Sequence, residues 1–354
     1  MQPMSRLRTH APVLAALAAA ALFGASTPFA KQLIGAAPPL LVAGLLYLGS
    51  GVGLTLVRVV RDRGWSAPGV ARGQWSWLLA AIAFGGAAAP ALLMLGLQQT
   101  SAGTASLLLN LEAVLTAMLA WIVFKENTDR RIVLGMALIV AGGAVLAWPG
   151  GGAGAAGSAG PLFIAGACLC WAIDNNLTRK VSAADALFIA AIKGLVAGGV
   201  NTGLAIATGA QLPPAAAVAS AALIGFLGYG VSLVLFVVAL RGLGSARTGA
   251  YFSTAPFIGA VLAIGVFHEP VSAAFWIAAL LMAAGVWLHL SEKHEHEHSH
   301  EPLYHTHQHV HDEHHQHVHD EEWDGREPHA HAHRHAALTH KHPHYPDIHH
   351  RHGH

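Results

Sequence analysis

Ten long apolar segments constrain this chain more than any other feature of its sequence. A helix needs about 20 mostly apolar residues to cross the hydrocarbon core of a bilayer. The segments that meet this requirement are 12–32, 38–58, 75–96, 103–124, 131–148, 161–179, 187–207, 217–239, 245–266 and 272–290. Their apolar runs are continuous and lack the period-two alternation of barrel strands, so they predict an all-α membrane protein with ten transmembrane helices.

The start of the chain also has features of a signal peptide. Arg6 and Arg8 precede the apolar run Ala11–Gly24, and the small residues Ala25-Ser26-Thr27 follow it. Because many further apolar segments come after it, we interpret this region as a retained first transmembrane helix.

Polar residues are unevenly distributed between the apolar body and the C-terminal tail. The whole chain is 54% hydrophobic and 11% charged, but residues 294–354 hold 23 of its 26 histidines. These residues carry 11 acidic and 4 basic side chains, whereas residues 1–293 carry 8 and 16. The tail has too few apolar residues to bury a core, so we expect it to be disordered and cytosolic. The only two cysteines, Cys168 and Cys170, exclude a disulfide framework.

An internal repeat organises the apolar body. Residues 97–148 align with residues 240–291 at a constant offset of 143. At this offset Phe124-Lys125-Glu126 coincides with Phe267-His268-Glu269. Each copy therefore holds an apolar helix, a short corner ending in Glu, and a second apolar helix.

A weaker repeat opens each half of the body. Phe23 and Lys31 correspond to Trp171 and Arg179 at an offset of 148, with an aromatic and a basic residue eight positions apart in both. We therefore expect two related halves of five helices each. The predicted domains are 11–148, a Gly-rich linker at 149–160, a second repeat at 161–291, and the tail at 292–354.

The distribution of Lys and Arg between loops predicts the orientation. Basic residues concentrate in every second loop, and such loops lie in the cytoplasm. These residues are Arg58, Arg61, Arg63, Arg72, Lys125, Arg130, Arg131, Arg179, Lys180, Arg241 and Arg247. Even-numbered spans then lead to the cytoplasm, so we expect a protein of the cell membrane with both termini on the cytoplasmic side. Five is an odd number, so the second half is inverted relative to the first, an arrangement that supports alternating access.

These features together resemble the drug/metabolite transporter superfamily, specifically the EamA family. The resemblance rests on the two five-helix halves, the aromatic-x7-basic signature, and the corners at Phe124-Lys125-Glu126 and Phe267-His268-Glu269. Ala255-Pro256-Phe257 matches the Pro-containing motif of that family, whereas the first half departs from it with Glu112-Ala113 at the matching place. The resemblance covers about 11–291 and implies a transporter of a small solute. Similar proteins move amino acids, nucleobases, sugar phosphates or drugs, so the substrate stays open.

Glu112 is the deepest ionisable residue of the body. It lies nine residues from the outer end of its segment, or roughly 13 Å at the α-helical rise. An ionisable side chain at the bilayer centre costs about 2.5–3.5 kcal/mol on insertion scales. Glu112 is therefore either a proton carrier or cation ligand, or a neutral acid hydrogen-bonded to a neighbouring helix. Thr116 shares its helix face, whereas Asn110 does not obviously do so.

Other polar residues of the spans are candidates for the substrate path. Asp174, Asn175 and Asn176 form an unusual polar run, which either lines a vestibule or caps helix ends. Lys193 either snorkels to the cytoplasmic surface or pairs with Glu112 or Asp174. The candidate substrate and coupling residues are Glu112, Asn110, Thr116, Asp174, Asn175, Asn176, Lys193, Tyr229 and Tyr251.

A few remaining residues have a structural interpretation. Lys31 is expected at the membrane interface, and Glu126 and Glu269 are expected to cap and orient their corners. Tyr229 and Tyr251 either line a cavity or pack between helices. Gly49-x-x-x-Gly53 favours close packing inside the bundle, with a homodimer as the alternative.

The tail has the composition of a metal-binding segment. Imidazoles interleaved with carboxylates suit Zn²⁺, Ni²⁺ or Co²⁺. Alternatives are a cytosolic metal buffer, a pH sensor or a composition without a role. The candidate ligands are His294, His296, His298, His300, His305, His307, His309, His311, His314, His315, His317, His319, His329, His331, His333 and His335.

Two functional hypotheses follow. The first is a metabolite or drug carrier in which Glu112 couples the substrate to protons, with the tail as an accessory. The second is a divalent-metal exporter whose tail captures the ion. No motif of an enzyme occurs in any span, and no cofactor is required. The expected partners are the lipid bilayer, the solute or metal ion and protons, but no nucleic acid.

Overall fold

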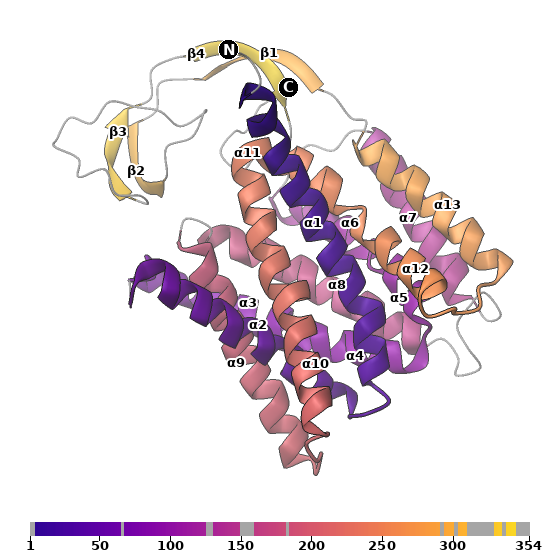
Figure 1. The fold of residues 1–354 in the computed structure, drawn as a ribbon. Helices are drawn as coiled ribbons and strands as arrows, with labels where there is room; N and C mark the ends of the chain where they lie inside the picture. Colours follow the sequence, from indigo (N-terminus) through magenta and orange to yellow (C-terminus); the bar gives the residue numbers. More distant parts are fainter. Residues whose placement is uncertain are drawn as a thin grey trace.

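The fold is described by a computed structural model covering residues 4–64, 67–124, 130–148, 159–181, 184–290, 294–300, 304–309, 329–334 and 338–344. Its body is helical (Figure 1). In chain order the elements are α1 (Met4–Leu33), α2 (Pro39–Asp62), η1 (Arg72–Gln74), α3 (Trp75–Ala81), η2 (Ile82–Ala88), α4 (Ala89–Gln99), α5 (Ala102–Leu108), α6 (Leu111–Phe124), α7 (Arg130–Ala147), α8 (Ala159–Thr178), η3 (Arg179–Val181), α9 (Ala186–Ala207), α10 (Ala215–Gly225), η4 (Phe226–Val231), α11 (Ser232–Phe252), α12 (Ala255–Gly265) and α13 (Ala273–Leu290).

Seven helical runs among the described residues are long and apolar enough to cross a membrane. They start at Ala11, Pro39, Arg72, Ala102, Arg130, Ala186 and Ala215. Two shorter apolar helices, Ala255–Gly265 and Ala273–Leu288, follow. The predicted helical membrane protein is thus confirmed, whereas its count of ten spans is not. The sixth predicted segment, 161–179, forms most of α8 but is not among the seven.

The ninth predicted span, 245–266, was wrong in its boundaries. Its first part continues α11 without the loop expected near Arg241 and Arg247, and α12 begins only at Ala255. Gly242 and Gly244 lie in this stretch, but a glycine costs a helix only about 1 kcal/mol. Pro256 has a larger effect, because its ring and missing N–H exclude a continuous helix through the preceding turn. The chain breaks at Ser253 and Thr254, directly before it.

Helices from the two halves pack against each other in matched pairs. α2 lies along α9, and α7 lies along α13 (Figure 1). α1 packs against α11 and α12, and its counterpart α8 packs against α4 and α6 in the same way. The bounds of α7 and α13 differ by 143 residues at both ends. Gly51 and Gly194 permit a close approach between α2 and α9, since a Cβ on Gly194 would lie 2.6 Å from the Gly51 Cα.

The Gly49-x-x-x-Gly53 motif also packs within the chain. A Cβ on Gly49 would meet the Ala222 backbone of α10, and one on Gly53 would meet the Phe226 ring of η4. Both glycines therefore contact other helices of the same chain, as the preferred interpretation of the motif expects.

The tail differs from the predicted disorder in four short segments. β1 (His294–His300) pairs antiparallel with β4 (Leu338–His344), and β2 (Tyr304–His309) pairs with β3 (His329–Arg334). The strict alternation of His with a second residue has the period of a strand, which the prediction from composition ignored. A two-stranded ladder without an apolar face is only marginally stable in water.

Candidate functional site

A π-helical turn interrupts the third span at the centre of the body. In η2 the Ala89 N–H donates to the Phe84 carbonyl, five residues back. The next residue is Pro90, which has no N–H to donate to Gly85. The Gly85 carbonyl is therefore released from the helical ladder, as often happens where π-turns occur at functional sites.

Side chains from two other helices satisfy the Gly85 carbonyl. Tyr47 of α2 donates its Oη–H to it at 3.1 Å, and Trp171 of α8 donates its Nε1–H at 3.0 Å. Two residues after Gly85, the Ala87 carbonyl accepts a hydrogen bond of 3.0 Å from Asn201 of α9. The π-turn thus joins α2, α8 and α9 through hydrogen bonds between buried groups.

Asp174 and Lys193 form an ion pair beside this turn. The Lys193 Nζ lies 2.7 and 2.6 Å from the two Asp174 carboxylate oxygens, and the two side chains are 17% and 8% exposed. Thr178 donates a further hydrogen bond to Asp174 at 2.8 Å. The absent side chain of Gly85 makes this position accessible, because a Cβ there would lie 2.5 Å from the Asp174 Cβ and closer to its carboxylate. The sequence left the partner of Lys193 open between two acids, and the structure places it on Asp174.

Glu112 lies at the start of a half-helix in the fourth span. The span is interrupted at Leu109 and Asn110, and Glu112 stands in the first turn of α6. A carboxylate at a helix N-terminus is stabilised by the helix dipole. Asn175 of α8 donates to the Glu112 Oε1 at 2.9 Å and to the Thr116 Oγ1 at 3.3 Å. Asn175 is exposed, so this cluster is on an open side of the helix pair.

A row of aromatic rings extends from the π-turn across the bundle. The rings of Tyr47 and Tyr229 are 5.4 Å apart, and Phe23 packs edge-on against Tyr229 at 5.9 Å. Phe252 follows Phe23 at 5.3 Å and Phe236 follows Phe252 at 4.9 Å. The row therefore begins at Tyr47, which shares the Gly85 carbonyl with Trp171 beside the Asp174–Lys193 pair.

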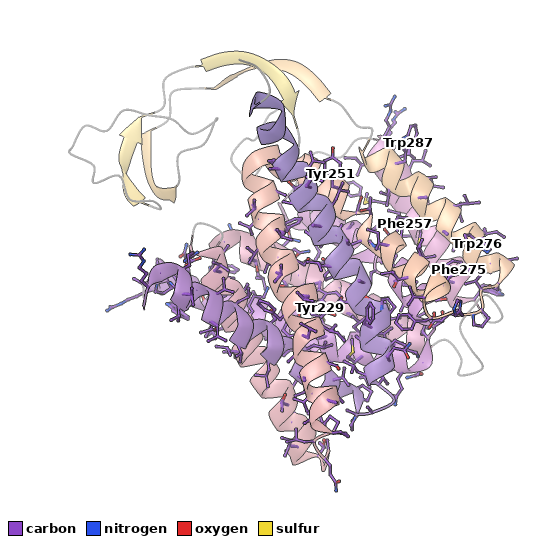
Figure 2. All side chains as sticks on the ribbon, in the orientation of Figure 1. Tyr229, Tyr251, Phe257, Phe275, Trp276 and Trp287 are labelled. Carbon is purple, nitrogen blue, oxygen red and sulfur yellow. The ribbon has the colours of Figure 1, made fainter. Side chains whose placement is uncertain are left out.

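The structure brings together six of the nine predicted site residues and places three elsewhere. Asn110 is buried and donates to the Leu107 carbonyl at 2.9 Å, where it caps α5. Asn176 donates to the Ala172 carbonyl of its own helix at 2.8 Å. Tyr251 is half-buried near Ala15, Ala16 and Ala239, at a different height of the bundle from Tyr229 (Figure 2).

The sequence analysis missed Tyr47, Trp171 in its hydrogen-bonding role, Gly85 and Asn201. Tyrosine and tryptophan do not stand out in an apolar span, and the partner of a buried amide depends on helix rotation. Pro90 was the available signal, because a proline within a predicted span frees a carbonyl that another group must satisfy.

The corner between α4 and α5 is stabilised by hydrogen bonds with Lys31 and Glu269, which are distant from it in the sequence. Lys31 donates to the Leu97 carbonyl and, at 2.9 Å, to the Thr100 carbonyl. The two Glu269 oxygens each accept a hydrogen bond of 2.9 Å, from the N–H groups of Ala102 and Gly103. Glu269 therefore caps a helix, as expected, but a helix of the opposite half. Glu126 lies outside the described residues.

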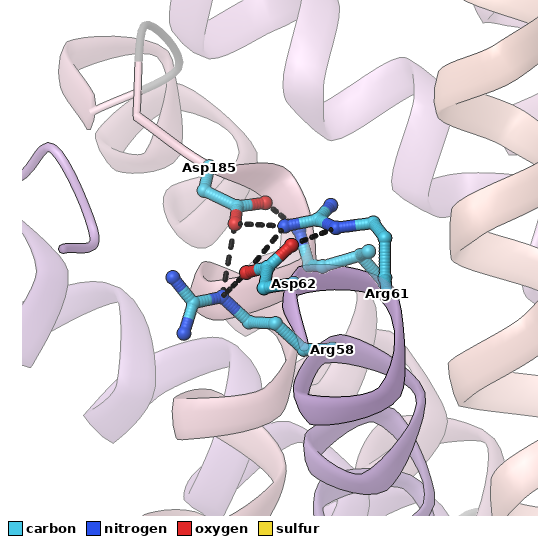
Figure 3. A network of polar contacts seen from close by, with 5 residues as sticks. Arg58, Arg61, Asp62 and Asp185 are labelled. Atoms are coloured by element: carbon cyan, nitrogen blue, oxygen red, sulfur yellow. Dashed lines mark hydrogen bonds and ion pairs between the residues drawn. The ribbon is translucent and has the colours of Figure 1, made fainter. Parts of the chain in front are cut away.

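An ionic network closes one end of α2 and α9 (Figure 3). Asp185 caps α9 by accepting from the Leu187 N–H at 3.0 Å. Its other oxygen accepts from Arg58 Nε at 2.9 Å and from Arg61 at 2.7 Å. Partial burial raises the pKa of Asp185, but the hydrogen bonds from Arg61 and Arg58 outweigh it and hold that pKa below its usual value.

No group of three or more His, Cys, Asp or Glu residues that could hold a metal ion occurs within the described residues. Of the predicted tail ligands, His311, His314, His315, His317, His319 and His335 lie outside them. The others fall on β1, β2 and β3. The register pairs His305 with His333 and His307 with His331.

Apolar helices that span a membrane, with a charged cluster between them, define a multi-pass membrane protein. The EamA-like transporter family matches residues 10–148 and 158–291, and the chain belongs to this family. Two halves of the body are matched separately, one on each side of the Gly-rich segment.

Individual relatives agree with this assignment. An uncharacterized transporter of Methanothermobacter thermautotrophicus is 26% identical over 296 residues, 77% of this chain and 84% of the relative. A probable 4-amino-4-deoxy-L-arabinose-phosphoundecaprenol flippase subunit ArnE of Pseudomonas paraeruginosa is 39% identical over 107 residues, 30% of this chain and 89% of the relative. A solved crystal structure with 19% identity has the same fold, with a TM-score of 0.60 over 79% of this chain and 96% of the other.

Proposed function

We propose that this transporter exports a small solute across the cell membrane by alternating access, with Glu112 coupling the movement to protons. The observation that carries this proposal is the cluster of Glu112, Asp174 and Lys193 inside an apolar helical body. Charged groups within a membrane span are costly and usually face a substrate or ion path.

Partial exposure of the cluster supports an aqueous route to it. Glu112 and Thr116 are partly exposed and Asn175 is exposed, although all three lie on helices that are mostly apolar. An ionised carboxylate in contact with lipid would be strongly unfavourable. The exposed side of this cluster is therefore better explained by a water-filled path, along which Glu112 can exchange a proton.

The paired packing supports ten spans in two inverted repeats. α2 packs on its counterpart α9 and α7 on its counterpart α13, as expected about a pseudo-twofold axis. The two π-turns also correspond. η2 starts at Ile82 and η4 starts at Phe226, so they are separated by 226 − 82 = 144 residues, close to the repeat offset of 143. Together with the Lys and Arg bias of the loops, this arrangement supports a cytoplasmic location of both termini.

The similarity to the flippase subunit limits the choice of substrate only loosely. That protein is named for a lipid-linked amino sugar, and the match covers 30% of this chain. We therefore propose a small solute without taking over that substrate.

A reconstituted system tests proton coupling. Liposomes holding the purified protein and a trapped pH dye are given an imposed pH gradient and then candidate solutes, after a growth screen of a deletion strain has selected them. The wild type should dissipate the gradient when its solute is added, and Glu112→Gln should not. Glu269→Gln, a change to a carboxylate outside the cluster, is the matched control. Equal flux through Glu112→Gln at several pH values would contradict the proposal.

We further propose that the His-rich tail binds Zn²⁺, Ni²⁺ or Co²⁺ in the cytosol. A second candidate function, export of a divalent metal, is favoured by the tail alone. The described body offers no cluster of three metal-binding side chains to continue the path. Deleting 294–354 should alter tolerance to zinc, nickel or cobalt if the metal is cargo or regulator. Unchanged tolerance and cell metal content would eliminate the metal exporter.

A further inference from the structure

The charges of the central cluster do not balance. Lys193 contacts both oxygens of Asp174 at 2.7 and 2.6 Å, so these two residues form a neutral pair. Glu112 receives a hydrogen bond from the neutral amide of Asn175 at 2.9 Å. The described residues of the cluster therefore carry one excess negative charge when both acids are ionised.

The Glu112 carboxylate has room for a further donor. An ionised carboxylate offers about four acceptor positions, and Asn175 uses Oε1. The first turn of α6 adds the positive end of a helix dipole, which favours the anionic form. Because Asn175 is exposed, a cation arriving by an aqueous route can reach this carboxylate.

A metal cation fits this place poorly. Ca²⁺ takes six to eight oxygen ligands, and Zn²⁺ takes about four ligands that are mostly His and Cys. Within the described part of the chain, no three His, Cys, Asp or Glu residues are grouped to hold such an ion. An ammonium group needs only a carboxylate and one or two hydrogen-bond acceptors, and Glu112 and Thr116 supply them.

The neighbouring residues already bind a primary ammonium in this way. Lys193 is an alkylammonium held by the Asp174 carboxylate, with the Thr178 hydroxyl on the same acid at 2.8 Å. Glu112 and Thr116 on α6 have the same four-residue spacing as Asp174 and Thr178 on α8, and Asn175 donates to both of them. Asp174 has its ammonium partner in Lys193, and no ammonium group contacts Glu112 within the described part of the chain.

Aromatic rings adjoin the cluster on one side. Tyr47 shares the Gly85 carbonyl with Trp171, and Gly85 contacts Asp174. Beyond Tyr47 the row continues through Tyr229 and Phe23. Aromatic faces attract cations and accommodate apolar groups. Acidic solutes are disfavoured, because a second negative charge a few ångströms from Glu112 would be repelled in a medium of low dielectric constant.

We propose that the solute is a primary amine with an apolar or aromatic body, bound through its ammonium group to Glu112 and Thr116. This inference rests on the proposed transport function for its physiological meaning, but binding can be measured without transport. The amine supplies the charge that balances Glu112, as Lys193 does for Asp174.

Three matched probes test the charge preference directly. 2-Phenylethylamine, 2-phenylethanol and phenylacetate share one aromatic body and differ in charge. Each is titrated calorimetrically into the purified full chain in detergent at pH 7.5. The amine should bind at least tenfold more tightly than the alcohol or the acid, and Glu112→Gln should weaken amine binding at least tenfold. Glu269→Gln should bind the amine as the wild type does.

Two results would overturn the inference: tighter binding of the acid or alcohol than of the amine, or unchanged amine binding by Glu112→Gln. Glu112→Asp, which keeps the charge, should retain the preference for the amine and serves if Glu112→Gln does not fold. Amine binding that depends on Glu112, together with no proton flux in liposomes, would contradict the coupling proposal while supporting this one.

Discussion

At the scale of single residues, Gly85 controls the position of Asp174. A Cβ on residue 85 would overlap the Asp174 side chain. Gly85→Ala should therefore displace the carboxylate from Lys193 and lower the free energy of unfolding by about 1–3 kcal/mol, the usual cost of overpacking. Thermal unfolding of the purified protein in detergent measures this change.

The control for this prediction is Gly199→Ala in α9, because nothing lies within 4 Å of a Cβ at that position. An alanine there should leave the unfolding temperature unchanged or raise it slightly, since alanine favours helices. Equal effects of the two substitutions would show that contact with Asp174 is not the cause.

Individual residues of the cluster differ in how predictable they were. Glu112, Asp174 and Lys193 stand out in the sequence, because a charge within an apolar segment is unusual. Their pairing did not follow from the sequence, since it depends on how α6, α8 and α9 are rotated about their axes. Tyr47 contributes through a hydroxyl that only the freed Gly85 carbonyl makes important.

At the scale of elements, the Gly85 carbonyl of η2 accepts a hydrogen bond from Tyr47 that a backbone N–H at position 90 could replace. Pro90→Ala gives residue 90 an N–H that can donate to Gly85. Tyr47→Phe should cost about 1 kcal/mol in the wild type, where it removes a buried donor. It should cost clearly less in the Pro90→Ala background. Unfolding of the two single variants and the double variant forms the cycle that measures this coupling, and equal costs in both backgrounds would exclude it.

The N-terminus of α9 gives a prediction that depends on pH. The pKa of Asp185 is lowered in the folded protein, so its ion pairs stabilise the fold above the unfolded pKa of about 3.9. That stabilisation is lost as the pH falls through the folded pKa. Asp185→Asn should be less stable than the wild type at pH 7 by about 1–2 kcal/mol, and the difference should shrink below about pH 4.

Asn retains an N-cap acceptor, so this variant isolates the charge of Asp185. Asp185→Ala removes the cap as well and should be less stable than Asp185→Asn at every pH. A difference between wild type and Asp185→Asn that stays constant from pH 7 to pH 3 would contradict the role of the ion pairs.

Element boundaries show where sequence patterns were sufficient. Seven spans follow from length and apolarity alone. The end of α11 did not, because a loop was expected around Arg241 and Arg247 and the helix runs on to Phe252. The proline that determines the break, Pro256, had been recognised as a family motif rather than as a helix stop.

At the scale of the whole molecule, the repeat is visible in both sequence and packing. The offset of 143 predicts that the corner after α6 corresponds to the corner after α12. The helices that follow these corners, α7 and α13, have bounds that differ by the same offset. What the offset did not predict is that α2 packs on its counterpart α9 and α7 on its counterpart α13. Packing partners far apart in the chain follow from folding of the complete body. The hydrogen bond from the Ala102 N–H at the start of α5 to Glu269 is one such contact between halves.

The account depends on two halves that cross the membrane in opposite directions and enclose the Glu112 cluster. The most direct test is to label each terminus with a reagent applied first to one side of the membrane and then to the other. Single cysteines near residue 2 and in the tail, in a background with Cys168 and Cys170 replaced, are exposed to an impermeant maleimide in intact cells and in inverted vesicles. Both should react only in inverted vesicles. If one terminus reacts in intact cells and the other in inverted vesicles, the number of crossings is odd and the inverted repeat is wrong.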